Sequence, residues 1–309
     1  MTHALFVAGP AALDCAFGTT ARIISAKHFS HVAKLFWNSA RRPEARGCRK
    51  VRVSVQVPEE ALAFGFDNNP IGTHISRTIM LADLRSILAA CDPLAKVEAY
   101  RSAVVDENVL LKPTLTTRKR SYWRLRELYR FDTHVLLFQA LRDLWDDDNT
   151  AQPLLAVLCA TATDPILRST AATILSTAVG IEVTPHMLAE AVQAAFPDRY
   201  NATSLASIGR NVASSWQQSG HLQGKLHKVR AQAESRPAAV AYALLFGYLC
   251  GARGEALFHT LWAQLLDAPV HVLREQAFAA SQRGWLEYRY AGDVTDISFR
   301  YLLREQERG

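Results

Sequence analysis

The chain has 309 residues, of which 49% are hydrophobic and 21% are charged, and its formal net charge is +6. This composition excludes intrinsic disorder as the main state, because the apolar fraction is large enough to build a core. The mild basic excess is compatible with an anionic partner but does not require one, so the placement of the cations matters more than their sum.

The cysteines and the hydropathy favour a cytoplasmic protein with no membrane contact. The five cysteines stand far apart, are odd in number and never form a Cys-x-x-Cys pair, which is typical of reduced thiols. The longest apolar stretch, Ala238–Cys250, is shorter than the roughly 20 residues that a membrane span needs. The first residues resemble a secretory signal only faintly, because no Lys or Arg precedes their apolar part and Asp14 interrupts it.

Residues 1–72 lack clean helical periodicity and are predicted to form a poorly defined N-terminal extension. They contain a basic run, Arg41–Arg52, and end in a loop-like stretch, Asp67–Gly72. Poor packing, or a true start at Met80, is the preferred interpretation. A basic arm for nucleic acid is the alternative.

Helical periodicity begins after residue 72, and residues 73–182 are predicted to form an N-terminal helical domain. An apolar stripe runs along Met80–Cys91 with the spacing of one helix face. Residues 114–117 offer an N-cap for a basic helix that reaches Tyr129. Asp164-Pro165 predicts another helix start, since a capping residue precedes a proline at the first helical position.

The segment Lys112–Arg130 carries seven basic residues against one acid, Glu127, so its local charge of +6 equals that of the whole chain. Cations in the first turn of this helix oppose the helix dipole, so helix stability does not explain them, whereas phosphate binding does. The alternatives are a solvated basic face or pairing with the acidic run Asp146–Asp148. The candidate DNA contacts in this segment are Arg118, Lys119, Arg120 and Arg124.

Residues 183–309 are predicted to form a C-terminal winged-helix-like domain. Thr184-Pro185 starts a helix, a second helix runs from about Thr203 to Gly220, and a basic ribbon follows. Alternating apolar and polar residues on both sides of Gly292-Asp293 predict a β-hairpin. The order of helix, short loop, helix and hairpin is that of a winged helix. Because strand signals are few in the rest of the chain, the expected fold class is mainly α. We expect a helical bundle with helix-turn-helix or winged-helix-like units and a short C-terminal β-hairpin.

The helix after Thr203 has an apolar stripe on one side and a polar, nearly acid-free face on the other. Side chains of Arg, Asn, Gln and Ser donate to and accept from base edges and phosphates, as groove reading requires. The ribbon after Gly220 adds cations where a wing would contact phosphate. Winged-helix units also dock proteins, so DNA contact is one of two interpretations. The candidate DNA-binding residues here are Ser207, Arg210, Asn211, Ser214, Gln217, Lys225, His227, Lys228 and Arg230.

No catalytic or cofactor motif stands out in the chain. It has no Gly-rich dinucleotide fingerprint, no Walker loop, no His-Glu-x-x-His pair and no Cys/His cluster with metal-ligand spacing. No grouping of Ser, His and an acid can be argued from the sequence. We therefore expect a protein that is not an enzyme and that uses no cofactor, no metal and no small-molecule substrate.

Three short motifs follow one another, Glu107–Thr114, Thr117–Arg120 and Leu125–Tyr129, and a helix that begins at Asp164-Pro165 comes after them. In these motifs the chain, from about residue 76 to 303, resembles the BrxA family of bacterial phage-exclusion (BREX) defence systems. The resemblance implies a helical protein with winged-helix-like parts that binds double-stranded DNA. It also implies other defence proteins as partners, including a methyltransferase, an ATPase and a phosphatase-like protein. The chain is longer than the family pattern at both ends.

The leading hypothesis is a non-enzymatic, DNA-binding component of a phage-defence system. The alternative is a helical adaptor whose basic segments face acidic protein partners. A specific transcriptional regulator is less favoured, because it usually needs a dimer that reads a two-fold site. A nuclease is least favoured, because no carboxylate cluster stands beside a lysine in a strand context.

Overall fold

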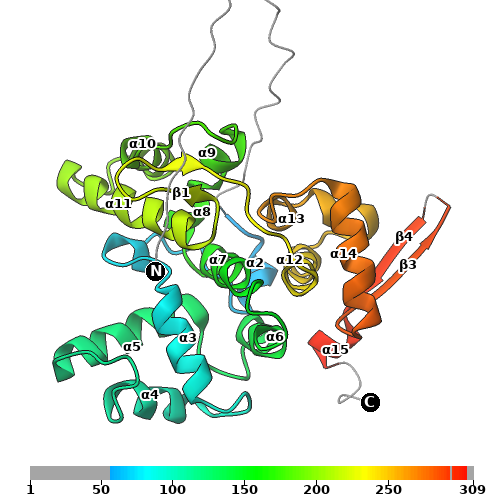
Figure 1. Cartoon of the computed structure of the whole chain (residues 1–309), viewed down its shortest axis with the longest axis horizontal. Coiled ribbons are helices and arrows are strands. Elements are labelled where there is room, and N and C mark those ends of the chain that lie inside the picture. The colour runs from blue at the N-terminus through cyan, green and yellow to red at the C-terminus, as the bar shows by residue number, and fades with distance from the viewer. Residues whose placement is uncertain (1–55, 293, 305–309) are drawn as a thin grey trace, which may run out of the picture. The chain divides into compact units, whose positions relative to one another are not determined.

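The computed structural model describes residues 56–292 and 294–304, and all of them belong to one compact unit that spans Lys50–Gly309. The described chain is mainly helical with small antiparallel hairpins, which confirms the predicted mainly α class (Figure 1). The predicted basic arm, Arg41–Arg52, lies outside the described residues. So do Cys15 and Cys48.

Helices make up most of the described chain, and two of them are short 3-10 helices, η1 and η2. From the N-terminal side the elements are α2 (Glu59–Leu62), η1 (Thr73–Ile75), α3 (Leu81–Ala90), α4 (Val97–Val105), α5 (Leu115–Tyr129), α6 (Leu136–Trp145), α7 (Gln152–Thr163), α8 (Pro165–Ser169) and α9 (Ala171–Ser176). They continue with α10 (Pro185–Ala195), α11 (Ala202–Gln218), β1 (Leu222–Gln223), β2 (Val229–Arg230), α12 (Pro237–Leu249), η2 (Gly254–His259), α13 (Leu261–Gln264), α14 (Val270–Gln282), β3 (Glu287–Ala291), β4 (Val294–Ser298) and α15 (Arg300–Leu303).

Helices α7 and α12 form the centre of the core. Both are buried along nearly their whole length. Helix α12 is apolar on every side because α6, α7, α13 and α14 pack around it (Figure 1). This packing explains the long apolar stretch Ala238–Cys250. Within residues 56–292 and 294–304, no helix combines the length and the apolarity that crossing a bilayer would take.

Residues 57–72 pack into this core, in contrast to the poorly defined extension that the sequence predicts. The Phe66 ring packs edge-on against aromatic rings of α12 and α13. The Asn68 side chain bonds to both the N–H and the carbonyl group of Val57, at 2.9 Å each. The buried Arg168 donates to Asn68 Oδ1 at 3.0 Å. The segment lacks helical periodicity because long-range contacts, rather than a helix face, hold it in place.

The predicted helix starts at Thr114, Asp164 and Thr184 are confirmed, because each side chain accepts a hydrogen bond from a backbone N–H in the first turn. Helix α11 begins at Ala202, with Asn201 rather than Thr203 as its cap. The C-terminal hairpin is confirmed as β3 and β4. The predicted boundary between residues 182 and 183 falls inside the compact unit, where α10 packs against α8 and α9.

Candidate nucleic-acid interface

Helix α5 carries most of the basic segment, and one apolar side anchors it to the core. Tyr122, Leu125 and Tyr129 are buried on that side. Thr114 caps the helix by accepting from the backbone N–H of Thr117 at 3.2 Å. Because the apolar side is fixed in the core, the opposite side of the helix points its cations to solvent.

Two of the four predicted cations of this segment are engaged within the fold. Arg118 is half-buried and donates to the carbonyl oxygens of Val105 at 3.3 Å and Lys112 at 3.4 Å. It therefore lies at the C-terminal end of α4, where the helix dipole favours a cation. Arg124 pairs with Glu127 at 2.7 Å. The sequence could not show that Arg118 donates to the last carbonyl group of the neighbouring helix α4.

The other two cations, Lys119 and Arg120, are exposed, and neither bonds to any residue that the structure describes. Beside them lies a pocket of about 480 Å³ between α5 and the segment that follows η1. Trp123 lines this pocket and is 56% exposed. The pocket is lined by Ser76, Arg77, Arg120, Trp123, Arg124 and Glu127.

Sequence reasoning missed two members of this pocket, Arg77 and Trp123. Arg77 follows η1, in a stretch where no periodicity marks a structural element. Trp123 stands inside the basic segment, one residue after Tyr122, and only its exposure distinguishes it from the buried aromatic residues of the same helix. The only signal that the sequence offered was a tryptophan inside a run of arginines, a pairing of aromatic ring and cation that binding sites use.

Helices α10 and α11 and the β1–β2 hairpin form a second connected group. The two helices cross closely at Gly209, where a Cβ atom would lie 2.2 Å from the carbonyl oxygen of Pro185. Strands β1 and β2 pair antiparallel, and a bridge from Glu182 to Val229 adds a short third segment beside them. This group presents the second predicted set of DNA contacts.

The polar face of α11 that the sequence assigns to groove reading is only partly exposed. Asn211 donates to the backbone oxygen of His74 at 3.1 Å. Gln217 accepts a hydrogen bond from Lys228 Nζ at 2.7 Å. Three predicted contacts are thereby engaged in holding the fold, because packing against η1 and the hairpin covers part of this face. Among the residues that the structure describes, Ser207, Arg210 and Ser214 have no hydrogen-bond partner outside this face.

The hairpin after α11 keeps only part of its predicted cationic character. Arg230 is 3% exposed, and its two terminal nitrogens contact the Asp267 carboxylate at 2.7 and 2.9 Å. It is a structural residue, and we remove it from the candidate interface. His227 is exposed but contacts the Glu182 carboxylate at 2.9 Å. Lys225 is exposed, and its side chain has no partner in the part of the chain that the structure describes.

Comparison with known proteins does not assign a function to this chain. No family model and no curated protein matches the chain. The functional assignment therefore depends on where the fold leaves charge and aromatic surface accessible. That place is the surface of α5 beside Arg77, with a smaller contribution from Arg210 and Lys225.

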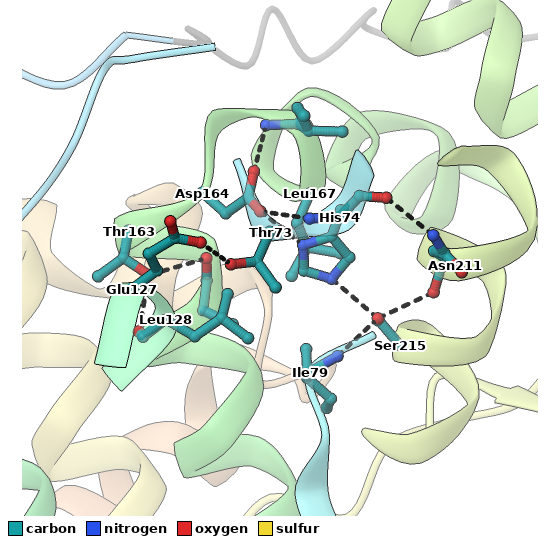
Figure 2. A network of polar contacts seen from close by, with 12 residues as sticks. Thr73, His74, Ile79, Glu127, Leu128, Thr163, Asp164, Leu167, Asn211 and Ser215 are labelled. Atoms are coloured by element: carbon teal, nitrogen blue, oxygen red, sulfur yellow. Dashed lines mark hydrogen bonds and ion pairs between the residues drawn. The ribbon is translucent and has the colours of Figure 1, made fainter. Parts of the chain in front are cut away.

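The 3-10 helix η1 links α5 to α8 and α11 through polar contacts, and those to α8 and α11 are buried (Figure 2). The His74 ring lies with Nδ1 2.7 Å from Asp164 Oδ2 and with Nε2 2.9 Å from Ser215 Oγ. The Thr73 hydroxyl donates to Glu127 Oε2 at 2.8 Å. One short segment therefore fixes the position of α5 relative to α11.

Asp164, His74 and Ser215 are the residue types of a nucleophilic triad, and no sequence pattern brings them together. All three are buried. Ser215 Oγ accepts from the Ile79 N–H at 3.0 Å and donates to the carbonyl oxygen of Asn211 at 2.9 Å. A catalytic serine must reach its substrate and pass its proton to the histidine. We therefore assign this group to positioning rather than to nucleophilic attack.

The stability of the protein is expected to fall between about pH 6.5 and pH 4 because of His221, which follows α11. Its ring is buried, with Nε2 2.9 Å from the Leu265 oxygen and Nδ1 2.8 Å from Ser219 Oγ. Burial lowers the pKa of His221 to about 4. As the pH falls, the unfolded chain takes up the proton first, so the folded state loses up to about 3 kcal/mol across this window.

Urea denaturation at pH 7, 6, 5 and 4 measures this loss, and a His221→Gln variant is the comparison. The variant should show a flatter profile between pH 6.5 and 4, because glutamine does not titrate. Identical profiles for the two proteins would contradict the assignment.

Proposed function

We propose that this protein is not an enzyme and that it binds double-stranded DNA, with the α5 surface as the main contact. The observation that supports this proposal is a group of three cations, the half-buried Arg77 and the exposed Lys119 and Arg120, which have no acidic partner among the described residues. The one acid beside them, Glu127, is already paired with Arg124. Cations without an acidic partner contribute favourably to DNA binding, because each phosphate contact releases counterions from the DNA.

We infer a second contact at the α10–α11–β1–β2 group. Its order of helix, helix and hairpin is that of a winged-helix unit, and the bridge at Glu182 supplies the third strand position. Arg210 on α11 and Lys225 in the hairpin are its accessible cations. The segment from η2 through α14 to β3–β4 repeats the same order, but its arginines on β3 and α15 are paired with Glu287.

The resemblance to the BrxA family supports a place in a BREX-like phage-defence system. In this setting the protein would act in the cytoplasm, on DNA and beside the other defence proteins. The surface chemistry fits such a role, because cations that contact the DNA backbone bind without strong sequence preference.

Fluorescence anisotropy of a labelled duplex across a salt series tests the proposal. The wild-type protein should bind with an affinity that falls steeply with salt. A Lys119→Ala/Arg120→Ala variant should reduce the slope of log K against log salt by about 2, since each phosphate contact contributes about 0.9. A Lys225→Ala variant should reduce it by about 1.

The matched control is Arg289→Ala/Arg300→Ala, which removes the same charge from exposed residues that are paired with Glu287 at 3.5 Å. Its salt slope should stay close to that of the wild type. If the folded wild-type protein does not bind duplex DNA at low salt, the DNA proposal is wrong. It is also wrong if the control and test variants reduce the salt slope by the same amount.

The second candidate function is a helical adaptor, and one observation favours it. A mainly apolar groove of about 670 Å³ lies between α10 and α11, lined by Ala189, Leu205 and Ala206 among others. Arg210 stands at its edge, and Ser207 is its one hydrogen-bond partner among the described residues. The fitting occupant is an amphipathic helix whose acidic residue faces Arg210. This function takes precedence if the duplex-binding experiment fails.

A further inference from the structure

The pocket beside α5 has the size and the lining of a site for a single nucleotide. Its volume of about 480 Å³ lies within the roughly 300–1,000 Å³ that small-ligand sites occupy. It is formed by two separate parts of the chain, the segment after η1 and one side of α5. Because Thr73 and His74 hold η1 to α5, α8 and α11, the two walls keep a defined separation (Figure 2).

The charge of the pocket is not balanced by the protein. Three arginines line it against one carboxylate, Glu127, which leaves a net charge of +2 (three minus one). The Glu127 carboxylate already pairs with Arg124 at 2.7 Å and accepts a hydrogen bond from the Thr73 hydroxyl at 2.8 Å. Among the described residues, Arg77 donates only to the neighbouring carbonyl of Ser76, at 3.2 Å, and Arg120 has no partner. Two guanidinium groups are thus ready to bind a phosphate.

Trp123 supplies the apolar half of the pocket. The side chain is 56% exposed, although Tyr122 beside it is buried. The Arg126 guanidinium lies 5.4 Å from its ring centroid and the Tyr122 ring lies 5.8 Å away, and the Trp123 side chain still lines the pocket. An exposed tryptophan next to guanidinium groups is the arrangement on which unpaired nucleic-acid bases stack. Phosphate contact alone would not need it.

We propose that this pocket takes one unstacked nucleotide of a DNA strand, with its base on Trp123 and its phosphate between Arg77 and Arg120. This inference rests on the proposed DNA binding and makes it more specific. A fully paired duplex keeps its bases stacked inside the helix and offers only phosphates to this surface. The protein therefore prefers DNA that carries an unpaired nucleotide, such as a bulge or an overhang, over a continuous duplex of the same length.

Competition anisotropy with three duplexes of one sequence tests the preference. The first is fully paired, the second carries a single-nucleotide bulge, and the third carries an abasic residue at the bulge. The wild-type protein should bind the bulged duplex about tenfold more tightly than the other two, which is the scale of one base–aromatic stack. Trp123→Ala should abolish this difference, and Trp123→Phe should keep most of it.

Equal affinity for the paired and the bulged duplex would overturn the pocket proposal, as would equal affinity for the bulge with and without its base. If the paired duplex is still bound with the salt slope expected from Lys119 and Arg120, DNA binding stands and only the pocket proposal fails. If none of the three duplexes is bound, both fail. Trp123→Ala replaces an exposed side chain, so unchanged circular dichroism is expected and confirms that the variant is folded.

Discussion

Replacing Asp164 by alanine is expected to lower the free energy of unfolding by about 3–5 kcal/mol, because several buried donors lose their acceptor and each unsatisfied donor costs about 1–3 kcal/mol. The carboxylate accepts from the His74 ring at 2.7 Å, from the His74 N–H at 3.0 Å and from the Ile166 N–H at 2.9 Å. The variant leaves these donors buried without an acceptor and removes the cap of α8. Urea denaturation at pH 7 measures the loss.

The matched control is Glu98→Ala, which removes the same charge from an exposed site and should cost less than about 0.5 kcal/mol. Burial alone would raise the pKa of Asp164, but His74 and the backbone donors outweigh it, so the pKa of this carboxyl lies below its ordinary value. Its contribution is therefore present above about pH 4 and is lost as the pH falls further. A loss under 1 kcal/mol for Asp164→Ala would contradict this account.

The close approach of Gly72 explains why the backbone can pass over this carboxylate. A Cβ atom at that position would lie 2.0 Å from Asp164 Oδ1. Any larger residue would push η1 away from α8 and with it the wall of the pocket that carries Arg77. The positioning of the proposed DNA surface thus depends on a glycine that is not itself part of that surface.

The Asp267→Ala variant should lose stability on a similar scale, about 3–5 kcal/mol, because it leaves Arg230 buried without its partner. Asp267 also accepts from the Ala233 N–H at 2.9 Å. Its backbone has φ 56°, a left-handed conformation that asparagine tolerates at least as well as aspartate. Asp267→Asn therefore separates the loss of charge from backbone strain, and thermal denaturation at pH 7 measures both variants.

The double variant Arg230→Met/Asp267→Asn is the critical comparison. It removes both charges, so it should recover a substantial part of the stability that Asp267→Asn alone loses. If the double variant is no more stable than the single one, the uncompensated charge of Arg230 is not the cause. A DNA-binding measurement on a folded Arg230→Met variant should show no change in salt slope, because this residue lies outside the interface.

The helices could be predicted well because their signals are local. The starts at Thr114, Asp164 and Thr184 came from a capping residue and, in two cases, a proline that follows it. The cap of α11 was placed at Thr203 instead of Asn201, because two capping residues stand within one turn and only backbone geometry distinguishes them.

The candidate site was predicted in part, and its pocket was not. Lys119 and Arg120 came from the charge of their own segment. Arg77 could not be assigned, because it joins the site only through the fold of η1 against α5. The polar face of α11 was overestimated for the same reason, since η1 and the hairpin cover Asn211 and Gln217.

The sequence by itself determined that the protein is mainly helical, where α5, α8 and α10 begin, and that α5 is strongly basic. These properties depend on residues within one or two helical turns. Only the tertiary structure decided which cations remain free. Arg230 meets Asp267 across 37 positions and His74 meets Asp164 across 90, and no local pattern encodes such partners. Charge is a property of each residue, whereas its availability to DNA depends on what the fold places beside it.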